Sequence, residues 1–123
     1  MRAMESMMRS TLLAFLCLAG CDRPRLATED GKQIFETICA RCHGNDGKGE
    51  ATARLRLGVP DMSTPEWQGA HADAAIAAQI RDGSKNKKMP GFGDYFTDEQ
   101  IAAIVAHVRT LGGGPASPTR SRR

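Results

Sequence analysis

Cys39 and Cys42 stand two residues apart and are followed directly by His43. The chain has 123 residues and four cysteines; of the other two, Cys17 lies in an apolar N-terminal run and Cys21 follows that run. Such a length supports one small domain. A domain of this size buries little surface and commonly needs a metal, a disulfide or another staple for stability. The segment with the paired cysteines is the place in this sequence where a staple can be attached.

The C-x-x-C-H pattern of Cys39, Cys42 and His43 is that of c-type haem attachment. Cysteines at i and i+3 share one face of a helix, so each thiol can add to one of the two vinyl groups of a haem. His43 comes next and can ligate the iron from the proximal side. A thioredoxin-like pair would need a surrounding βαβ pattern, and a zinc site would need a second Cys/His pair. We therefore predict one covalently bound haem c with its iron.

The first 20 residues have the layout of a secretory signal peptide, with an apolar run from Leu12 to Ala19 that is too short to span a bilayer. The segment Leu18–Cys21 resembles the lipobox of bacterial lipoproteins, in which the cysteine is lipidated. Ordinary cleavage with an unmodified Cys21 is the alternative. We predict a leader over 1–20, a lipidated Cys21 with a tether over 21–27, a folded domain over 28–111 and a disordered tail over 112–123.

The charge distribution argues against a nucleic-acid partner. The whole chain has a formal net charge of +3, but residues 28–111 hold 10 basic and 12 acidic residues. The basic excess therefore lies in the leader, the tether and the tail. A folded domain without a basic surplus lacks the electrostatic footprint of nucleic-acid binding.

Apolar periodicity predicts three main helices, and no segment alternates in the manner of a strand, so the expected fold class is all-α. The first helix covers about residues 28–42 and delivers the cysteine motif at its C-terminal end. The second covers about 72–81 and stops before a glycine. The third, over 97–111, has the strongest pattern, because Thr97 and Gln100 form a capping box ahead of a continuous apolar stripe.

Met89 is the predicted second axial ligand of the iron. It lies in a loop between two predicted helices, where Pro90 biases it away from helical angles and nearby glycines let the backbone approach a flat cofactor. A thioether ligand favours ferrous iron, and two filled axial positions favour electron transfer over oxygen chemistry. Among the other candidates, we expect Met62 to fill the core, His71 to be solvated and His107 to be a packing or surface residue.

Residues 31–111 together resemble a small monohaem class I cytochrome c of the kind that bacteria tether to a membrane as a lipoprotein. The resemblance implies a small cytochrome c fold and a hydrogen bond from His43 Nδ1 to the Pro60 carbonyl, which would orient the ring. It also implies that Gly31 and Phe35 pack against the last helix. His107 departs from the family, which usually has Tyr or Trp there, and can make this helix contact pH-sensitive.

Trp67 has two readings that the sequence leaves open. The indole can line the haem edge or reach a propionate with its N–H, or it can be an aromatic residue that fills a small core.

The predicted function is that of a periplasmic, lipid-anchored electron carrier that acts on no small-molecule substrate and is not itself an enzyme. Lys85, Lys87 and Lys88 precede Met89 and are expected to steer acidic redox proteins, with a merely solvated loop as the alternative. The residue after Cys21 is an aspartate, which resembles an inner-membrane retention signal. Two other functions stay open: a haem-based gas sensor, and the electron-entry subunit of a larger oxidoreductase.

Overall fold

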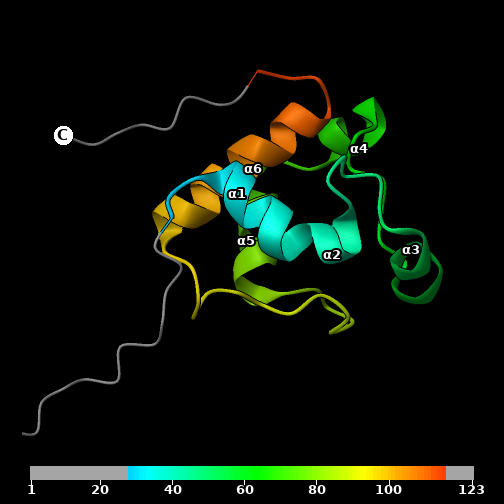
Figure 1. The fold of residues 1–123 in the computed structure, drawn as a ribbon, viewed down its shortest axis with the longest axis horizontal. Helices are drawn as coiled ribbons and strands as arrows, with labels where there is room; N and C mark the ends of the chain where they lie inside the picture. The colour runs from blue at the N-terminus through cyan, green and yellow to red at the C-terminus, as the bar shows by residue number, and fades with distance from the viewer. Residues whose placement is uncertain (1–27, 116–123) are drawn as a thin grey trace, which may run out of the picture.

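The computed structural model describes residues 28–115, and every regular element there is helical (Figure 1). The elements are α1 (Gly31–Ile34), the π-helix η1 (Phe35–Cys39), α2 (Ala40–His43), α3 (Ala51–Leu57), α4 (Pro65–Ala70), α5 (Asp73–Asp82) and α6 (Asp98–Leu111). The all-α prediction is confirmed. The predicted leader, the lipidated Cys21, the tether and residues 116–123 of the predicted tail lie outside the described residues.

The segments α1, η1 and α2 follow one another without a break and form one N-terminal helix. The Asp30 carboxylate caps its start by accepting the backbone N–H groups of Lys32 and Gln33, at 2.9 and 3.3 Å. The first helix therefore begins at Gly31, three residues later than predicted. It ends at Gly44, whose φ of 70° lies in the region that favours glycine. The cysteine motif occupies the last turns of this helix, as the sequence predicted.

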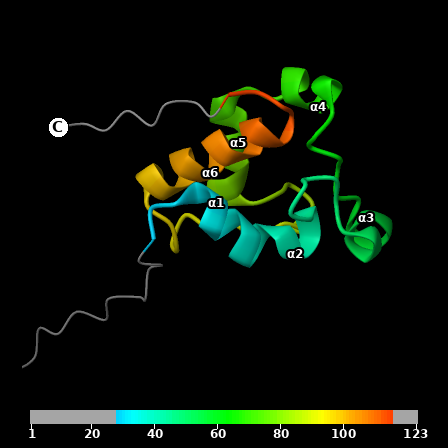
Figure 2. The same ribbon diagram turned by 45° about the horizontal axis from the view of Figure 1, so that its top comes forward.

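The C-terminal helix α6 begins with the predicted capping box. The Thr97 hydroxyl accepts the Gln100 N–H at 3.1 Å, and the Gln100 side-chain oxygen accepts the Thr97 N–H at 2.9 Å. The Gln100 amide also donates to the Thr28 carbonyl at 2.8 Å, so this buried side chain ties the start of the domain to α6. Figures 1 and 2 both show α1 lying against α6.

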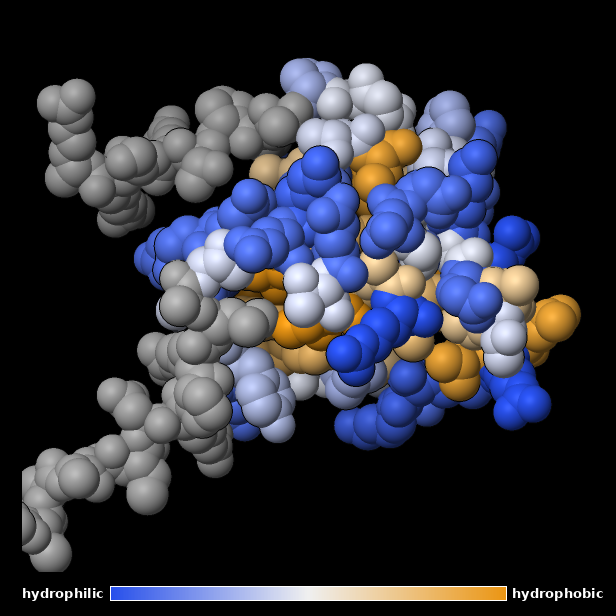
Figure 3. Space-filling model, viewed as in Figure 1, coloured by the Kyte–Doolittle hydropathy of each residue, from blue (hydrophilic) through white to orange (hydrophobic). Residues whose placement is uncertain are grey.

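The core lies between the N-terminal helix, α5 and α6. Its buried members are the apolar side chains Ile34, Phe35, Met62, Ile76, Ile80, Phe96, Ile101, Ile104, Val105 and Val108. Met62 is therefore a core residue, as predicted. Figure 3 shows a largely hydrophilic outer face in which hydrophobic side chains appear as separate patches, which is ordinary for a globular surface.

The close approach of α1 to α6 depends on Gly31. A Cβ atom built on Gly31 would collide with the backbone carbonyl of Ala103 in α6. Overpacking of this kind commonly costs about 1–3 kcal/mol. We expect Gly31→Ala to lower the free energy of unfolding of the haem-loaded chain by at least about 2 kcal/mol, measured by denaturant titration.

Gly69→Ala is the matched control for this experiment, because a Cβ on Gly69 in α4 would meet no atom within 4 Å. Alanine is the better helix former, so this variant should keep or slightly raise stability. Equal stability of the Gly31→Ala and Gly69→Ala variants would contradict the proposed role of the helix contact.

Candidate functional site

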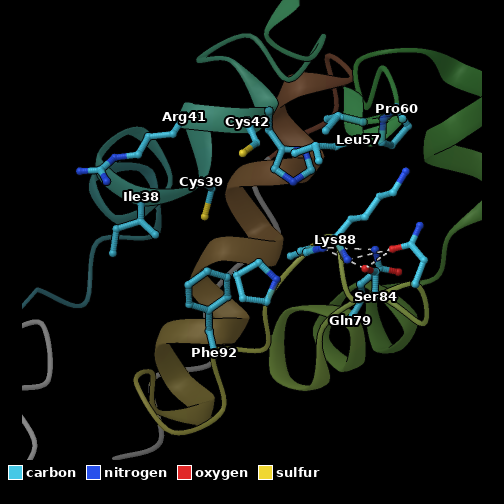
Figure 4. Close-up of a pocket in the computed structure, with 16 residues that line it drawn as sticks. Ile38, Cys39, Arg41, Cys42, Leu57, Pro60, Gln79, Ser84, Lys88 and Phe92 are labelled. Atoms are coloured by element: carbon cyan, nitrogen blue, oxygen red, sulfur yellow. Dashed lines mark hydrogen bonds between the residues drawn. The ribbon is translucent and has the colours of Figure 1, made fainter. Parts of the chain in front are cut away.

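Two adjoining pockets, of about 280 and 170 Å³, open between the N-terminal helix and the segment that joins α5 to α6. The two pockets share five of their lining residues, namely Cys39, His43, Pro60, Gln79 and Met89. They are therefore two parts of one space, which we call the cleft. Figure 4 shows side chains from these segments around the larger part.

The N-terminal helix supplies the two thiols of the cleft. Cys39 lines both parts and Cys42 lines the larger part, and both cysteines are free. Burial raises the pKa of Cys39 to about 11, with a smaller contribution from the neighbouring Cys42. A thiol that stays protonated is a poor nucleophile for disulfide exchange. The electrostatics of Cys39 therefore argue against a thioredoxin-like redox pair.

His43 brings an imidazole to the same cleft. Burial lowers the pKa of His43, so the neutral ring that metal coordination requires is favoured. Its Nδ1 atom is buried and has no hydrogen-bond partner among residues 28–115. Pro60 lines both parts of the cleft, but the expected bond from Nδ1 to its carbonyl is not formed there. A hydrogen-bonding role for Pro60 stays a prediction.

Met89 reaches the cleft from a different segment, the loop after α5. Its side chain is half-buried and packs against the core. The Met89 N–H donates to the Ser84 hydroxyl at 2.9 Å, and the Gln79 amide lies 3.8 Å from the Met89 sulfur. The structure thus brings an imidazole and a thioether to one space from two separate parts of the chain.

Trp67 and His71 line the smaller part of the cleft and stack on each other, with ring centroids 4.4 Å apart. His71 is half-buried, contrary to the expectation that it would be solvated. The His71 ring is held by Trp67, since its Nδ1 atom lies 2.8 Å from the Trp67 carbonyl. Arg109 of α6 donates to the Gln68 and His71 carbonyls and pairs with Asp73 at 2.7 Å. These contacts hold α4 and the turn after it against α6. Trp67 consequently lies at the wall of the cleft while also contacting the core.

Three lysines occupy the loop before Met89, and all three are exposed. Lys88 lines the larger part of the cleft together with Arg41, and its ammonium group lies 3.5 Å from the Arg56 carbonyl. Lys85 and Lys87 lie beside it in sequence. We call these three lysines the basic rim, of which Lys88 lines the cleft, although residues 28–111 have no basic surplus.

A family model described as cytochrome c oxidase, cbb3-type, subunit III matches residues 26–108. The chain belongs to this family. It is accordingly a c-type cytochrome domain, which binds haem c with its iron covalently. The donors in the cleft, two thiols, an imidazole and a thioether, fit this cofactor.

Relatives and solved structures agree with the family. The chain is 37% identical over 91 residues to the "Cbb3-type cytochrome c oxidase subunit FixPc" of Rhizobium leguminosarum bv. viciae, covering 74% of this chain and 30% of that protein. It is 30% identical over 88 residues to the "Cbb3-type cytochrome c oxidase subunit CcoP" of Azospirillum brasilense, covering 72% and 30%. The chain thus spans 30% of the length of these two curated relatives.

Among solved structures, the "KustC0563 c-type cytochrome" is similar with a TM-score of 0.60 and 29% identity. The match covers 70% of this chain and 98% of that one. The small cytochrome c fold expected from the sequence is therefore confirmed. Within residues 28–115, no helix has the length and apolar character needed to cross a membrane.

Among the cleft residues that were not singled out from the sequence, Gln79 and Ser84 are the two that contact Met89. Gln79 lies in α5 between the buried Ile76 and Ile80, so a polar residue on an otherwise apolar stretch was the available signal. Ser84 gave no such signal, because serine after a helix-ending glycine is common in any loop. Its contact with Met89 depends on the folded loop.

His107 of α6 packs against Phe35 of η1, with ring centroids 5.0 Å apart, and its Nε2 atom is buried without a partner in the described residues. Burial is the main reason that the pKa of His107 is lowered. The charge of Lys32 lowers this pKa further, whereas the charges of Glu36 and Asp30 raise it. The unfolded chain therefore binds a proton at this ring more readily than the folded chain does. The contribution of the neutral His107 ring to the free energy of unfolding is therefore fully present above the ordinary histidine pKa. It is lost as the pH falls below that value.

We expect the free energy of unfolding of the haem-loaded chain to decrease as the pH falls from 7.5 through the ordinary histidine pKa of about 6.5. His107→Phe should make this decrease shallower, since an aromatic ring remains against Phe35 but cannot be protonated. Denaturant titrations of both chains at several pH values measure the difference. An identical pH profile in the two chains would show that His107 does not contribute.

Proposed function

We propose that the chain carries single electrons on a haem c that Cys39 and Cys42 hold through thioether bonds, with His43 and Met89 as the axial ligands. The observation that supports this most is the meeting of His43 and Met89 in one cleft, from the N-terminal helix and from the loop after α5. When bound, the haem iron takes up and releases one electron at a time. The chain by itself performs no reaction on a small-molecule substrate.

The protein groups around the cleft have separate tasks in this proposal. Ile38 and Phe92 line the larger part and would present apolar surface to the cofactor, which strengthens the electrostatic interactions of the ligands. Trp67 lies at the wall of the smaller part and would line one edge of the bound cofactor. Pro60 would supply a carbonyl to His43 Nδ1 when the cofactor is bound, since this buried atom has no partner in the described residues.

The spectrum of the full chain matured with haem tests the proposed ligand set. We expect haem that stays attached after denaturation, a low-spin spectrum in both redox states, and no response of the reduced protein to carbon monoxide. A high-spin spectrum, or binding of carbon monoxide, would instead support the gas-sensor alternative, in which Met89 leaves the iron.

We further propose that the domain is a lipoprotein of the class I monohaem type. In this proposal a lipidated Cys21 anchors it on the periplasmic side of the inner membrane. The signal-peptide layout of residues 1–20, followed by Cys21 in a lipobox-like segment, supports the lipid anchor. Two or more acyl chains give stable anchoring, whereas one chain gives only marginal binding. A Cys21→Ser variant of the full chain should then move from the membrane fraction to the soluble fraction, and membrane retention of that variant would contradict the anchor.

A second candidate function is that of the electron-entry subunit of a larger oxidoreductase. The relatives favour it, since both FixPc and CcoP are named as cbb3-type cytochrome c oxidase subunits. Mild-detergent purification of the full chain from its own membranes discriminates the two. Stoichiometric recovery of oxidase subunits supports the subunit, and recovery of the cytochrome alone supports the free carrier.

In either case, we propose that redox proteins dock at the basic rim formed by Lys85, Lys87 and Lys88. Charges of this kind mainly set the association rate and its salt dependence. Changing all three lysines to glutamine should slow electron exchange with an acidic partner at low salt and flatten the dependence on ionic strength. Lys32→Gln on α1 is the control, because Lys32 pairs with Glu36 away from the cleft.

A further inference from the structure

The loop that carries Met89 is closed by hydrogen bonds to one serine. The Ser84 N–H donates to the Met89 carbonyl at 3.0 Å, and the Ser84 hydroxyl accepts the Met89 N–H at 2.9 Å. The same hydroxyl donates to the Asn86 side-chain oxygen at 2.7 Å, which in turn accepts the Lys88 N–H at 3.0 Å. Ser84 therefore contacts both backbone polar groups of Met89. Figure 4 shows these bonds gathered around Ser84 and Lys88.

Close packing and a positive φ at a non-glycine residue mark the conformation of this loop. Gly83 has a φ of +81°, and a Cβ there would lie 2.7 Å from the Met89 carbonyl oxygen. Lys87 is the one non-glycine residue with positive φ, 62°, in the described part of the chain. A lysine adopts such an angle at a cost, which the hydrogen bonds from Ser84 and Asn86 offset. The hydrogen bonds thus stabilise a strained loop backbone in which Met89 has a defined position.

A second restraint acts on the other end of Met89. The Gln79 amide nitrogen lies 3.8 Å from the Met89 sulfur, within hydrogen-bonding range of a sulfur acceptor. Gln79 comes from α5, whose Ile76 and Ile80 are anchored in the core. A thioether sulfur is a weak acceptor, so an amide N–H directed at it leaves the remaining lone-pair density free for a metal. The restraint therefore sets which side of the sulfur is available.

We propose that Ser84 and Gln79 are the positioning residues of the axial methionine. Ser84 holds the backbone of Met89 and Gln79 orients its sulfur, so the thioether stays in place in both redox states. This inference rests on the proposed role of Met89 as an iron ligand. The strength of the bond between the Met89 sulfur and the iron then depends on two side chains that do not touch the metal.

The Ser84 part is tested by competition for the iron. A ligand such as imidazole binds the ferric protein only when Met89 leaves, so its apparent affinity reports how firmly the methionine is held. Losing the hydrogen bond to the Met89 N–H costs roughly 0.5–1.5 kcal/mol. We therefore expect Ser84→Ala, in the full haem-loaded chain, to bind imidazole roughly two- to tenfold more tightly. Ser84→Thr keeps the hydroxyl and should stay close to the wild type.

A matched control for Ser84→Ala is Thr110→Ala, which removes a hydroxyl that bonds to a backbone carbonyl of α6, at 2.6 Å from the His107 oxygen. It should leave the imidazole affinity unchanged. A purely structural effect would instead appear as equal changes in both variants.

The Gln79 part is tested by the reduction potential. The positive end of the amide dipole favours the less positively charged ferrous state. Gln79→Leu should therefore lower the potential, and Gln79→Glu should lower it further through its negative charge. Gln33→Leu, an exposed glutamine on α1, is the control and should leave the potential unchanged.

Failure of this inference is distinguishable from failure of the proposed function. If the wild type lacks a methionine-to-iron absorption band, or if Met89→Ala retains it, Met89 is not the ligand and the proposed function is wrong. If that band depends on Met89 while Ser84→Ala and Gln79→Leu match the wild type in imidazole affinity and potential, the positioning roles are wrong and the proposed function stands.

Discussion

Replacing both Cys39 and Cys42 with serine is expected to give a chain that binds no haem covalently and does not reach a stable fold. The cleft between the N-terminal helix and the loop after α5 is bordered by core residues, among them Phe35, Met62 and Ile104. Without the cofactor these side chains would face an empty or hydrated space, and the domain would lose much of its apolar burial. A domain of fewer than 90 described residues has little stability to lose.

Haem staining after denaturing electrophoresis measures the covalent attachment, and thermal melting followed by circular dichroism measures the fold. Each single variant should keep one thioether bond, and therefore retain haem with lower stability. Cys21→Ser is the control, since we place Cys21 in the lipid anchor and not in the cleft. Haem that remained attached to the double variant after denaturation would contradict the attachment at these two cysteines.

Replacing Met89 with alanine is expected to convert a closed haem site into an open one. The methionine-to-iron band of the ferric protein should disappear, and the reduced protein should bind carbon monoxide. The reduction potential should fall by on the order of 0.1 V, a modest part of the roughly 0.8 V that axial ligands span. The fold should persist, because Met89 is only partly buried and packs at the margin of the core.

Met62→Leu is the matched control for the Met89 variant. Met62 is 5% exposed and lies in the core, and leucine nearly conserves its volume. We expect this variant to keep the band and the resistance to carbon monoxide. Loss of the band in Met62→Leu, with its retention in Met89→Ala, would transfer the ligand role to Met62.

Most of the correct predictions of the fold came from patterns among residues close together in the sequence. The capping box of Thr97 and Gln100 involves residues three apart and formed as expected. The two short helices α3 and α4 were missed, since helices of seven and six residues show too little apolar periodicity. A signal for α4 was nevertheless present, because Thr64 caps it and Pro65 stands in its first turn.

The sequence by itself determined the local chemistry of this protein: the spacing of Cys39, Cys42 and His43, and the methionine before a proline. Each of these depends on residues within one helical turn or one loop. Only the tertiary structure decided the contacts between distant segments. Arg109 donates to the carbonyl of His71, 38 residues earlier, and so holds the turn that carries this half-buried ring against α6. Such pairings are set by how helices pack, and packing depends on the whole core at once.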